Sequence, residues 1–283
     1  MKSSSKFFKL LSLPVLLLVI VFLVVPSQQG YAQLKEPEVV KNPDPLTPYG
    51  QGLTNRWGID LQINNFGIGL TGHYARIVGR YTEITLEAGM TGLRDVSEQN
   101  FQDFFTGRRV IPNKYNRAFA FPILVGLKKR LFANEIADNF RFFLSTSAGP
   151  AMAFVFPYLN DQDNNGFRTL VQNQGFVVPA EPINDFLTGW KDGYTTWGGA
   201  GEIKLGVDLG TKFKTQTTVE IGYFFYYFAG GIQILEPNKP ARDSMGNLIF
   251  GGDIFVDTSN ELGFPAKKFF GTPQISIIVG GLW

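Results

Sequence analysis

The chain has 283 residues with 26 basic and 24 acidic side chains, which gives a formal net charge of +2. This near balance provides no electrostatic basis for binding nucleic acid, so no nucleic-acid partner is expected. The absence of cysteine excludes disulfide bonds and any lipid attached through a cysteine thiol.

The first 32 residues are predicted to form a secretory signal peptide. Three lysines at positions 2, 6 and 9 precede an apolar run over residues 10–25, and a small-residue cleavage site ends before Gln33. An uncleaved membrane anchor is the alternative, because a run of 16 residues approaches the length of a spanning helix. Pro26 and the polar residues after it favour cleavage. Removal of residues 1–32 takes away three lysines and no acids, so the charge would fall from +2 to −1.

The remainder of the chain is predicted to be all-β. Residues 33–55 form a proline-rich, extended lead-in. Residues 56–283 contain eight segments in which apolar and polar residues alternate, as they do in strands. No later apolar run is long enough for a membrane-spanning helix, so a chain in a membrane would need a closed sheet. The predicted strands are 56–63, 66–78, 81–93, 117–130, 140–156, 197–210, 217–232 and 271–283.

The connections between these strands alternate between short and long. This rhythm is typical of membrane β-barrels, which have tight turns on one side and long loops on the other. Only the Asn64-Asn65 connection departs from it, since it is tight where a long loop is due. Seven strands result if 56–78 is one strand, and ten result if 167–178 or 246–257 enters the wall. The short connections are 64–65, 79–80, 131–139 and 211–216, and the long ones are 94–116, 157–196 and 233–270.

Alternation within the strands predicts which side chains face which side of the wall. In the segment 197–210, Ile203, Leu205 and Val207 share one face. Glu202, Lys204 and Asp208 lie on the other. A basic side chain facing lipid costs about 2–4 kcal/mol, so the charged face must point inward in a membrane barrel. A soluble sandwich would show the same pattern, but the signal peptide and the loop rhythm favour the barrel.

The inward faces predict a network of charged residues inside the barrel. Eight strands enclose a bore narrow enough for side chains to fill, and buried charges persist when they are paired. We therefore expect a structural salt-bridge network, with an ion path as the alternative. Lys204 and Glu220 are expected to lie diagonally opposite each other. The predicted members are Glu83, Glu87, Lys128, Arg130, Arg141, Glu202, Lys204, Asp208 and Glu220, together with Asp60.

His73, the single histidine of the chain, is predicted to face inward near Glu87. A histidine beside a carboxylate could act as a general base. No serine-hydrolase or metalloprotease motif accompanies it, and it lies far from the predicted loop rim. We therefore expect an interior histidine with a hydrogen-bonding partner and no catalytic residue.

Aromatic residues near strand ends predict belts at the two membrane interfaces. The run 224–228 is aromatic at every position, so both faces of one strand carry rings. We expect a belt outside and close packing inside, with a ligand-stacking surface as the alternative. The predicted belt residues are Trp57, Tyr74, Tyr81, Phe140, Tyr158, Trp197, Tyr227 and Trp283.

Residues 161–166, Asp-Gln-Asp-Asn-Asn-Gly, match the start of a calcium loop. The twelfth position of such a loop would be Gln172, where a bidentate glutamate is expected. Short clusters of Asp, Asn and Gly also form ordinary turns. A solvated turn is thus the favoured interpretation, and a weak Ca²⁺ site at Asp161, Asp163 and Asn165 is the alternative. No other cofactor is predicted.

The final strand carries Ile275, Ile277, Val279 and Trp283 on one face. It resembles the closing strand of bacterial outer-membrane β-barrels, and residues 49–283 resemble small barrels of the OmpA/OmpX-like type from Bacteroidetes-like bacteria. The resemblance implies a closed antiparallel barrel in the outer membrane of a Gram-negative bacterium, surrounded by outer-membrane lipid, with both chain ends in the periplasm. It also implies that the barrel-assembly machinery reads these four residues. The chain departs from the full OmpA pattern because no peptidoglycan-binding domain follows the last strand.

This resemblance implies a function without enzymatic activity. We expect an integral barrel with a plugged interior whose loops, mainly 157–196 and 233–270, contact a protein partner or a surface. Some members of the family are accessory parts of secretion or surface assemblies. A narrow channel is the first alternative, and an enzyme that modifies lipids or peptides is the second.

Overall fold

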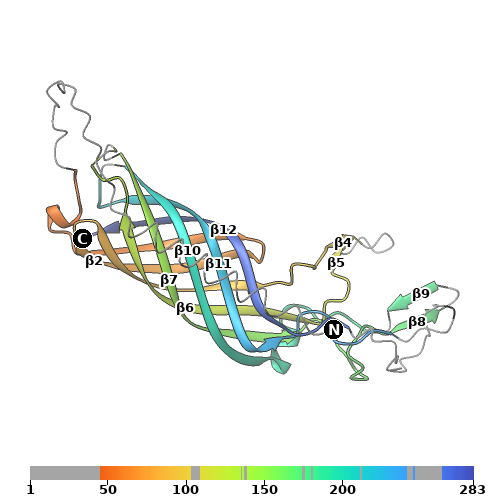
Figure 1. Cartoon of the computed structure of the whole chain (residues 1–283). Helices are drawn as coiled ribbons and strands as arrows, with labels where there is room; N and C mark the ends of the chain where they lie inside the picture. The colour runs from red at the N-terminus through yellow and green to blue at the C-terminus, as the bar shows by residue number, and fades with distance from the viewer. Residues whose placement is uncertain are drawn as a thin grey trace, which may run out of the picture. The chain divides into compact units, whose positions relative to one another are not determined.

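The computed structural model describes residues 45–102, 109–134, 136, 139–173, 176–179, 181–210, 212–240, 245 and 263–283. Eight long antiparallel strands form a closed barrel in the order β1-β12-β11-β10-β7-β6-β3-β2 (Figure 1). The predicted eight-stranded fold is therefore confirmed. The wall strands are β1 Asn55–Asn64, β2 Gly67–Gly79, β3 Thr82–Leu93, β6 Asn116–Arg130, β7 Phe140–Pro157, β10 Tyr194–Leu209, β11 Gln216–Ile232 and β12 Lys267–Leu282.

The last strand closes the barrel by pairing with both its neighbours. β12 pairs with β11, and it also pairs with β1 from Arg56↔Leu282 to Asn64↔Gln274. Beyond the strands, the Trp283 amide donates to the Asn55 carbonyl at 3.0 Å. Closure satisfies the backbone groups that an open sheet would leave at its edges.

The two ends of the barrel differ in their connections. At one end, which we call the terminus end, β1 begins, β12 finishes, and residues 80–81, 131–139 and 210–215 join neighbouring strands. At the opposite loop end lie the tight turn 65–66 and three long connections. The long connections are 94–115, 158–193 and 233–266, and we call their described residues the loop cap.

The long connections contain small elements of their own. β4 (Phe101–Gln102) pairs with β5 (Arg109–Val110), and β8 (Leu170–Asn173) pairs with β9 (Phe176–Pro179). Because β8 and β9 form a separate two-stranded sheet, the ten-strand alternative based on 167–178 is wrong. The segment 246–257, which was the other candidate, lies outside the described residues.

Several wall strands extend beyond their predicted bounds. β10 begins at Tyr194, which pairs with Val155, and β12 begins at Lys267, which pairs with Ile232. At the loop end, these strands continue past the segments in which apolar and polar residues alternate. The sequence pattern therefore ends earlier than the backbone pairing. The predicted loops 157–196 and 233–270 are correspondingly shorter.

The N-terminal lead-in is described only in part. Residues 1–32, the predicted signal peptide, and 33–44 lie outside the described residues. Residues 45–54 pack against the terminus end, where Leu53 contacts Ile77, Phe213 and Leu282. The 3-10 helices η1 (Tyr49–Gln51) and η2 (Thr188–Asp192) complete the secondary structure of the described chain. Within those residues, no helix has the length and apolar character needed to cross a bilayer.

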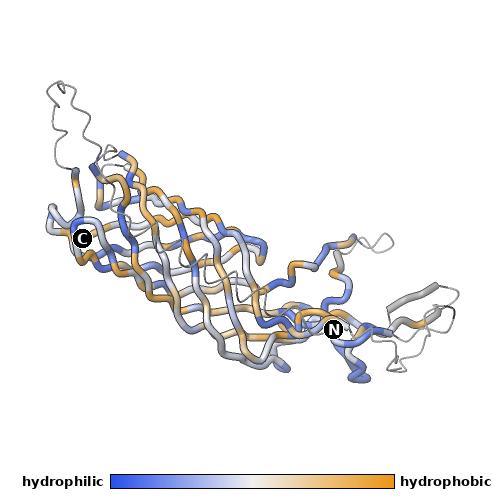
Figure 2. The backbone as a smooth tube through the Cα atoms, viewed as in Figure 1, coloured by the Kyte–Doolittle hydropathy of each residue, from blue (hydrophilic) through white to orange (hydrophobic). Residues whose placement is uncertain are grey.

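The wall alternates between an apolar outer face and a polar or small inner face. Figure 2 shows hydrophobic and hydrophilic residues interspersed along the strands. Large apolar side chains are exposed on the outer face of the wall strands, with Ile68 at 74% and Val279 at 60%. Among the described outward positions, charge lies near the strand ends, at Arg76 and Lys129 toward the terminus end and Arg117 toward the loop end.

The predicted aromatic belts are largely at the surface. Tyr81 is partly exposed, and six other predicted rings are exposed. Tyr158 is an exception, since it is only 7% exposed and the Arg117 guanidinium lies 4.7 Å from its ring centre. Its prediction as a belt residue is wrong because the loop cap covers the strand end beside it. The six exposed rings are Trp57, Tyr74, Phe140, Trp197, Tyr227 and Trp283.

Candidate functional site

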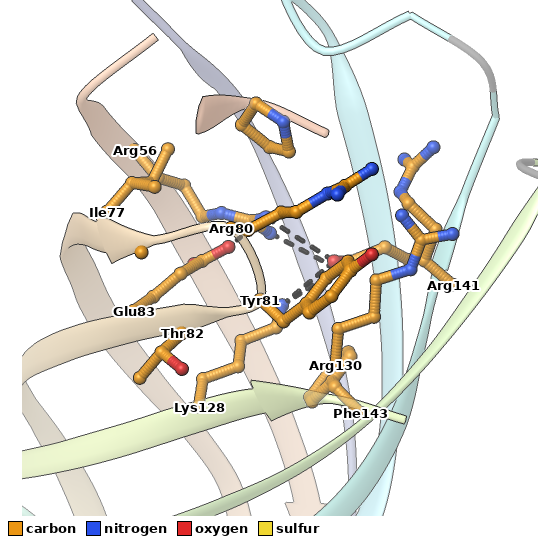
Figure 3. Close-up of a pocket in the computed structure, with 13 residues that line it drawn as sticks. Arg56, Ile77, Arg80, Tyr81, Thr82, Glu83, Lys128, Arg130, Arg141 and Phe143 are labelled. Atoms are coloured by element: carbon orange, nitrogen blue, oxygen red, sulfur yellow. Dashed lines mark hydrogen bonds and ion pairs between the residues drawn. The ribbon is translucent and has the colours of Figure 1, made fainter. Parts of the chain in front are cut away.

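The interior near the terminus end holds a charged group that we call the mouth cluster. Arg56 of β1 lies between two carboxylates, with Nη2 2.9 Å from Glu83 Oε1 and Nη1 3.2 Å from Asp208 Oδ1 (Figure 3). Lys128 Nζ also contacts Asp208, at 2.9 Å, and Thr218 donates its hydroxyl hydrogen to the same carboxylate. Neighbouring strands thus contribute alternate, inward-facing residues to one network of pairs.

Two predicted network residues lie at the rim of this cluster. Arg141 is buried and donates from Nη1 to the Gly210 carbonyl at 2.6 Å. Arg130 is only partly buried at the end of β6, where Nη1 donates to the Leu46 carbonyl at 2.9 Å. These contacts tie the lead-in and a short turn to the mouth of the barrel.

A cavity of about 30 Å³ opens among the mouth-cluster side chains. Arg80, Tyr81 and Glu83 line it, as Figure 3 shows. Its other charged lining residues are Arg56, Lys128, Arg130, Arg141 and Asp208. This volume has room for about one or two water molecules. It is therefore too small for a metabolite-sized substrate, which usually occupies about 300 Å³ or more.

A second group, the central cluster, surrounds Lys204 deeper in the barrel. Its Nζ lies 2.7 Å from Glu202, 3.0 Å from Glu220 and 3.1 Å from Glu87. Glu220 stands opposite Gly206, two residues from Lys204, so the expected diagonal contact is present. The Lys204 side chain is only 2% exposed, so one buried cation is shared among three buried carboxylates.

Hydroxyl and amide groups complete the central cluster. Ser147 donates to Glu202 at 2.8 Å, and Ser276 donates to Glu220 at 3.2 Å. Asp60 is 1% exposed and accepts from Gln62 Nε2 at 3.0 Å. These donors supply the hydrogen bonds that buried carboxylates require in addition to a counter-charge.

His73 lies inside the barrel, opposite Glu87 in the strand pairing. Its Nδ1 is 3.6 Å from Glu87 Oε1, and the residue is 7% exposed. The carboxylate that faces the imidazole is the one already shared with Lys204. The histidine therefore belongs to the central cluster, away from the loop rim.

The interior toward the loop end is apolar, and we call this part the apolar cluster. Phe224, Tyr226 and Phe228 of β11 are at most 2% exposed and pack against Ala120 and Phe270. The Tyr226 hydroxyl shares a 2.7 Å hydrogen bond with Thr91. Because these rings are enclosed, they offer no surface for stacking a ligand. Phe225 and Tyr227 of the same run are exposed on the outer face, as expected.

An aromatic group on the outer wall was not predicted from the sequence. Phe154 and Phe156 of β7 contact Trp190 of η2, each at a ring separation of 6.2 Å. Phe119 of β6 and Phe186 complete the group. Gly189 permits the approach, since a Cβ there would lie 2.4 Å from the Pro157 carbonyl oxygen. Phe156 faces outward by alternation yet is fully buried, because the 186–190 segment covers it.

The predicted calcium-loop residues lie in the loop cap. Asp161 accepts backbone hydrogens from Asn165 at 3.1 Å and Gly166 at 2.9 Å, and also accepts from the Tyr115 hydroxyl at 2.9 Å. Asn165 Nδ2 donates to Asp163 at 3.2 Å, while its side-chain oxygen accepts from the Phe167 amide. The Asn165 side chain therefore orients Asp163 through its amide nitrogen. Its amide oxygen is occupied by the Phe167 N–H and is not free to bind an ion.

Glu181, which follows β9, joins Asp161 and Asp163. One carboxylate oxygen from each of the three lies within 4.8 Å of the other two. Burial, and the neighbouring Asp163 carboxyl that shares a proton with it, raise the pKa of Glu181 to about 7. The same hydrogen bond lowers the pKa of Asp163. We call Asp161, Asp163 and Glu181 the acidic triad.

The terminal-strand residues predicted as an assembly signal face outward. Ile275, Ile277 and Val279 are 42–60% exposed, and Trp283 is 54% exposed. The Trp283 ring lies 6.5 Å from that of Tyr74, at the terminus end of the wall.

Arg56 of the mouth cluster and Glu181 of the acidic triad were not predicted. Arg56 could have been found from the sequence, because the alternation that turns Trp57 and Ile59 outward turns Arg56 inward. Glu181 could not have been found from the twelve-residue calcium pattern, since it lies beyond Gln172 and is brought back by the β8–β9 hairpin. The side chain of Gln172 itself lies outside the described residues.

No protein-family model matches this sequence, and no curated protein matches it as a relative. A major outer membrane protein from Thermus thermophilus is similar in structure, with a TM-score of 0.39 and 6% identity over 80% of this chain and 99% of its own. CarO2 from Acinetobacter baumannii has a TM-score of 0.30 and 14% identity over 81% and 98% of the two chains. CarO from the same organism has a TM-score of 0.26 and 12% identity over 80% and 97%. At these values the likenesses establish neither a family nor a function.

Proposed function

We propose that this chain is an integral outer-membrane β-barrel with a closed lumen and no enzymatic activity, and that its loop cap contacts a partner or surface. The observation that carries this proposal is the inverted polarity of the wall. Large apolar side chains are exposed on the outer face, and ion pairs lie inside the barrel.

The exposed apolar band is too extensive for a protein surrounded by water. Soluble monomers rarely expose a continuous apolar patch above a few hundred Å². Here β1 alone exposes Trp57, Ile59, Leu61 and Ile63, and the other wall strands continue the band. Removing one such side chain from water is worth about 1.5–3 kcal/mol, so lipid is the environment that stabilises this surface.

The outer membrane is favoured over other membranes by the predicted export signal at residues 1–32. The aromatic residues at the wall ends support the same placement, because amphipathic rings collect at membrane interfaces. Trp190 and Phe186 of the outer aromatic group extend this belt beyond the wall at the loop end, being 44% and 49% exposed.

A closed lumen is supported by what fills the barrel. Ions entering from the loop end would meet Tyr226 and Phe228, which are fully buried and packed against neighbouring strands. Ions entering from the terminus end would meet the mouth cluster and its small cavity. These filled positions at both ends favour a structural barrel over a channel.

Planar-bilayer recordings test the closed lumen. We expect the natural chain to show no steady current, whereas a variant that removes side chains from all three interior clusters, with Tyr226→Ala, Phe228→Ala, Lys204→Ala and Arg56→Ala, should conduct. The matched control is Tyr223→Ala with Phe225→Ala, which removes two rings from the outer face of the same strand. A steady current from the natural chain would contradict the proposal.

Membrane residence and loop contacts need a separate experiment. The mature chain should float with lipid vesicles and require detergent for extraction, and a folded, detergent-free monomer in buffer would contradict membrane residence. A cross-linked protein partner should be captured by the full chain and lost when residues 158–193 are shortened. Capture that is unaffected by this shortening would place the contact elsewhere.

A further inference from the structure

The acidic triad joins parts of one long connection that are separated in sequence. Asp161 and Asp163 precede β8, and Glu181 follows β9. The β8–β9 hairpin brings them together. At the base of the hairpin, the Thr169 amide donates a hydrogen bond of 2.9 Å to Glu181 Oε2. A group bound by the triad would therefore hold both sides of the hairpin base.

Glu181 reaches the triad with a carboxyl group whose polar neighbour is the Asp163 carboxyl. The residue is only 5% exposed, and its Oε1 is buried and accepts no hydrogen bond from an amide, a hydroxyl or a basic side chain. Among the described residues, no lysine or arginine forms an ion pair with the triad, and the Arg168 guanidinium donates to the Glu181 backbone carbonyl at 3.4 Å. Adjacent carboxyl groups without a counter-charge are unfavourable when they are all ionised, and a cation from solution would allow the three to be ionised together.

The chemistry of the triad fits Ca²⁺. Calcium binds six to eight oxygen atoms in flexible geometry and accepts carboxylates together with water. Asp163 is exposed, which leaves the solvent side of the triad open to water ligands. Magnesium demands a near-ideal octahedron and releases its water reluctantly, so three carboxylates on two separate segments suit calcium better.

The site lies where the three long connections meet. Tyr115, from the first, donates to Asp161. Asn238, from the third, donates to the Asn165 carbonyl at 2.7 Å. A bound ion would thus stabilise the contacts among all three connections as well as the hairpin.

We propose that Asp161, Asp163 and Glu181 form a Ca²⁺ site that orders the loop cap. Asp161 and Asp163 come from the turn 161–166. Glu181 supplies the acidic ligand that a calcium loop has at its twelfth position, where this chain has Gln172. The Asn165 side chain acts as a positioning group for Asp163. This inference goes beyond the proposed function and does not depend on the membrane or on the closed lumen.

Isothermal titration calorimetry of the full chain, folded in detergent and stripped of metal with a chelator, tests the site. We expect one saturable Ca²⁺ per chain with a Kd of about 10⁻⁴–10⁻³ M, as in extracellular calcium modules. Glu181→Gln and Asp163→Asn should each weaken binding about tenfold or more. Asp192→Asn, an exposed acid of the same connection, is the matched control and should change binding less than about twofold.

A second measurement keeps the test independent of folding defects. Calcium should slow hydrogen exchange of the Thr169 amide in the natural chain and in Asp192→Asn, and should have no such effect in Asp163→Asn, which changes an exposed side chain. Absence of saturable binding up to about 10 mM Ca²⁺ would overturn the proposal, as would unchanged binding in both triad variants. Equal affinity for Mg²⁺ would overturn the assignment to calcium.

Discussion

The two halves of the barrel interior are stabilised by different forces. Toward the terminus end, Lys204 and Asp208 each make several buried ionic contacts. Toward the loop end, Phe224 and Phe228 are buried by packing, and Tyr226 makes one hydrogen bond, to Thr91. The wall around both halves has the same alternation, so the difference lies in which residues occupy the inward positions.

This difference predicts which kinds of substitution should lower the stability of each half. A buried ionic cluster has a large cost when one partner is removed, because the remaining charges stay buried and unpaired. A packed apolar cluster loses the contact area and the cavity volume of the group removed. The charged half should therefore respond to changes of charge, and the apolar half to changes of volume.

Replacing Lys204 by methionine should have the largest effect. The substitution keeps most of the side-chain volume but leaves Glu87, Glu202 and Glu220 without their shared cation. We expect the free energy of unfolding to fall by about 3–5 kcal/mol, measured by urea unfolding of the reconstituted barrel. Lys129→Met, on the exposed face of β6, is the control and should change it by about 0.5 kcal/mol or less. Equal effects of the two substitutions would remove the distinction between the halves.

Tyr226→Phe should have a smaller effect in the apolar half. It preserves the ring and removes the hydroxyl that pairs with Thr91, so one buried hydrogen bond is lost. We expect a loss of about 1–3 kcal/mol in the same unfolding measurement. The accompanying change Thr91→Val should restore part of this loss, because it removes the partner left unpaired. A loss as large as that of Lys204→Met would mean that the hydrogen bond, and not packing, stabilises this half.

A change of pH should have the smallest effect of the three at the loop cap above the apolar half. Burial raises the pKa of Glu236 to about 7, although its Oε1 accepts the Arg168 amide at 3.0 Å. The closed cap thus retains a proton that the opened cap releases, so this stabilisation is complete below about pH 4.5 and is lost as pH rises through 7. Arg168 and Asp161 are the charged groups that act on this carboxyl.

Hydrogen exchange measured with chelator present, and corrected for intrinsic rates, checks this effect. Between pH 6 and 8 the free energy of opening at the Arg168 amide should fall by about 1 kcal/mol. Glu236→Gln should reduce the dependence and leave the part due to Glu181, whose pKa is also raised to about 7, and amides of β11 beside Phe228 should not change. An undiminished dependence in Glu236→Gln would assign the titration to another group.

Much of the barrel could be predicted from local sequence pattern. Because side chains in a strand alternate strictly, the exposed Ile203 and Leu205 also place Glu202 and Lys204 inside. The number of strands follows from counting such segments, and closure follows because an open edge would leave backbone groups unpaired. The same reasoning would have placed Arg56 inside, had it been applied to the first residue of its strand.

The partners of these side chains were decided by the tertiary structure. Arg56 meets Asp208 because closure brings β1 and β10 to the same bore, a contact that spans 152 positions of the chain. Glu181 meets Asp163 because a hairpin returns the chain, and Tyr158 and Phe156 are buried because loop residues cover them. Alternation is a property of neighbouring residues, so by itself the sequence determined the face of each side chain. Register, closure and loop packing depend on residues far apart, and they decided what each side chain contacts.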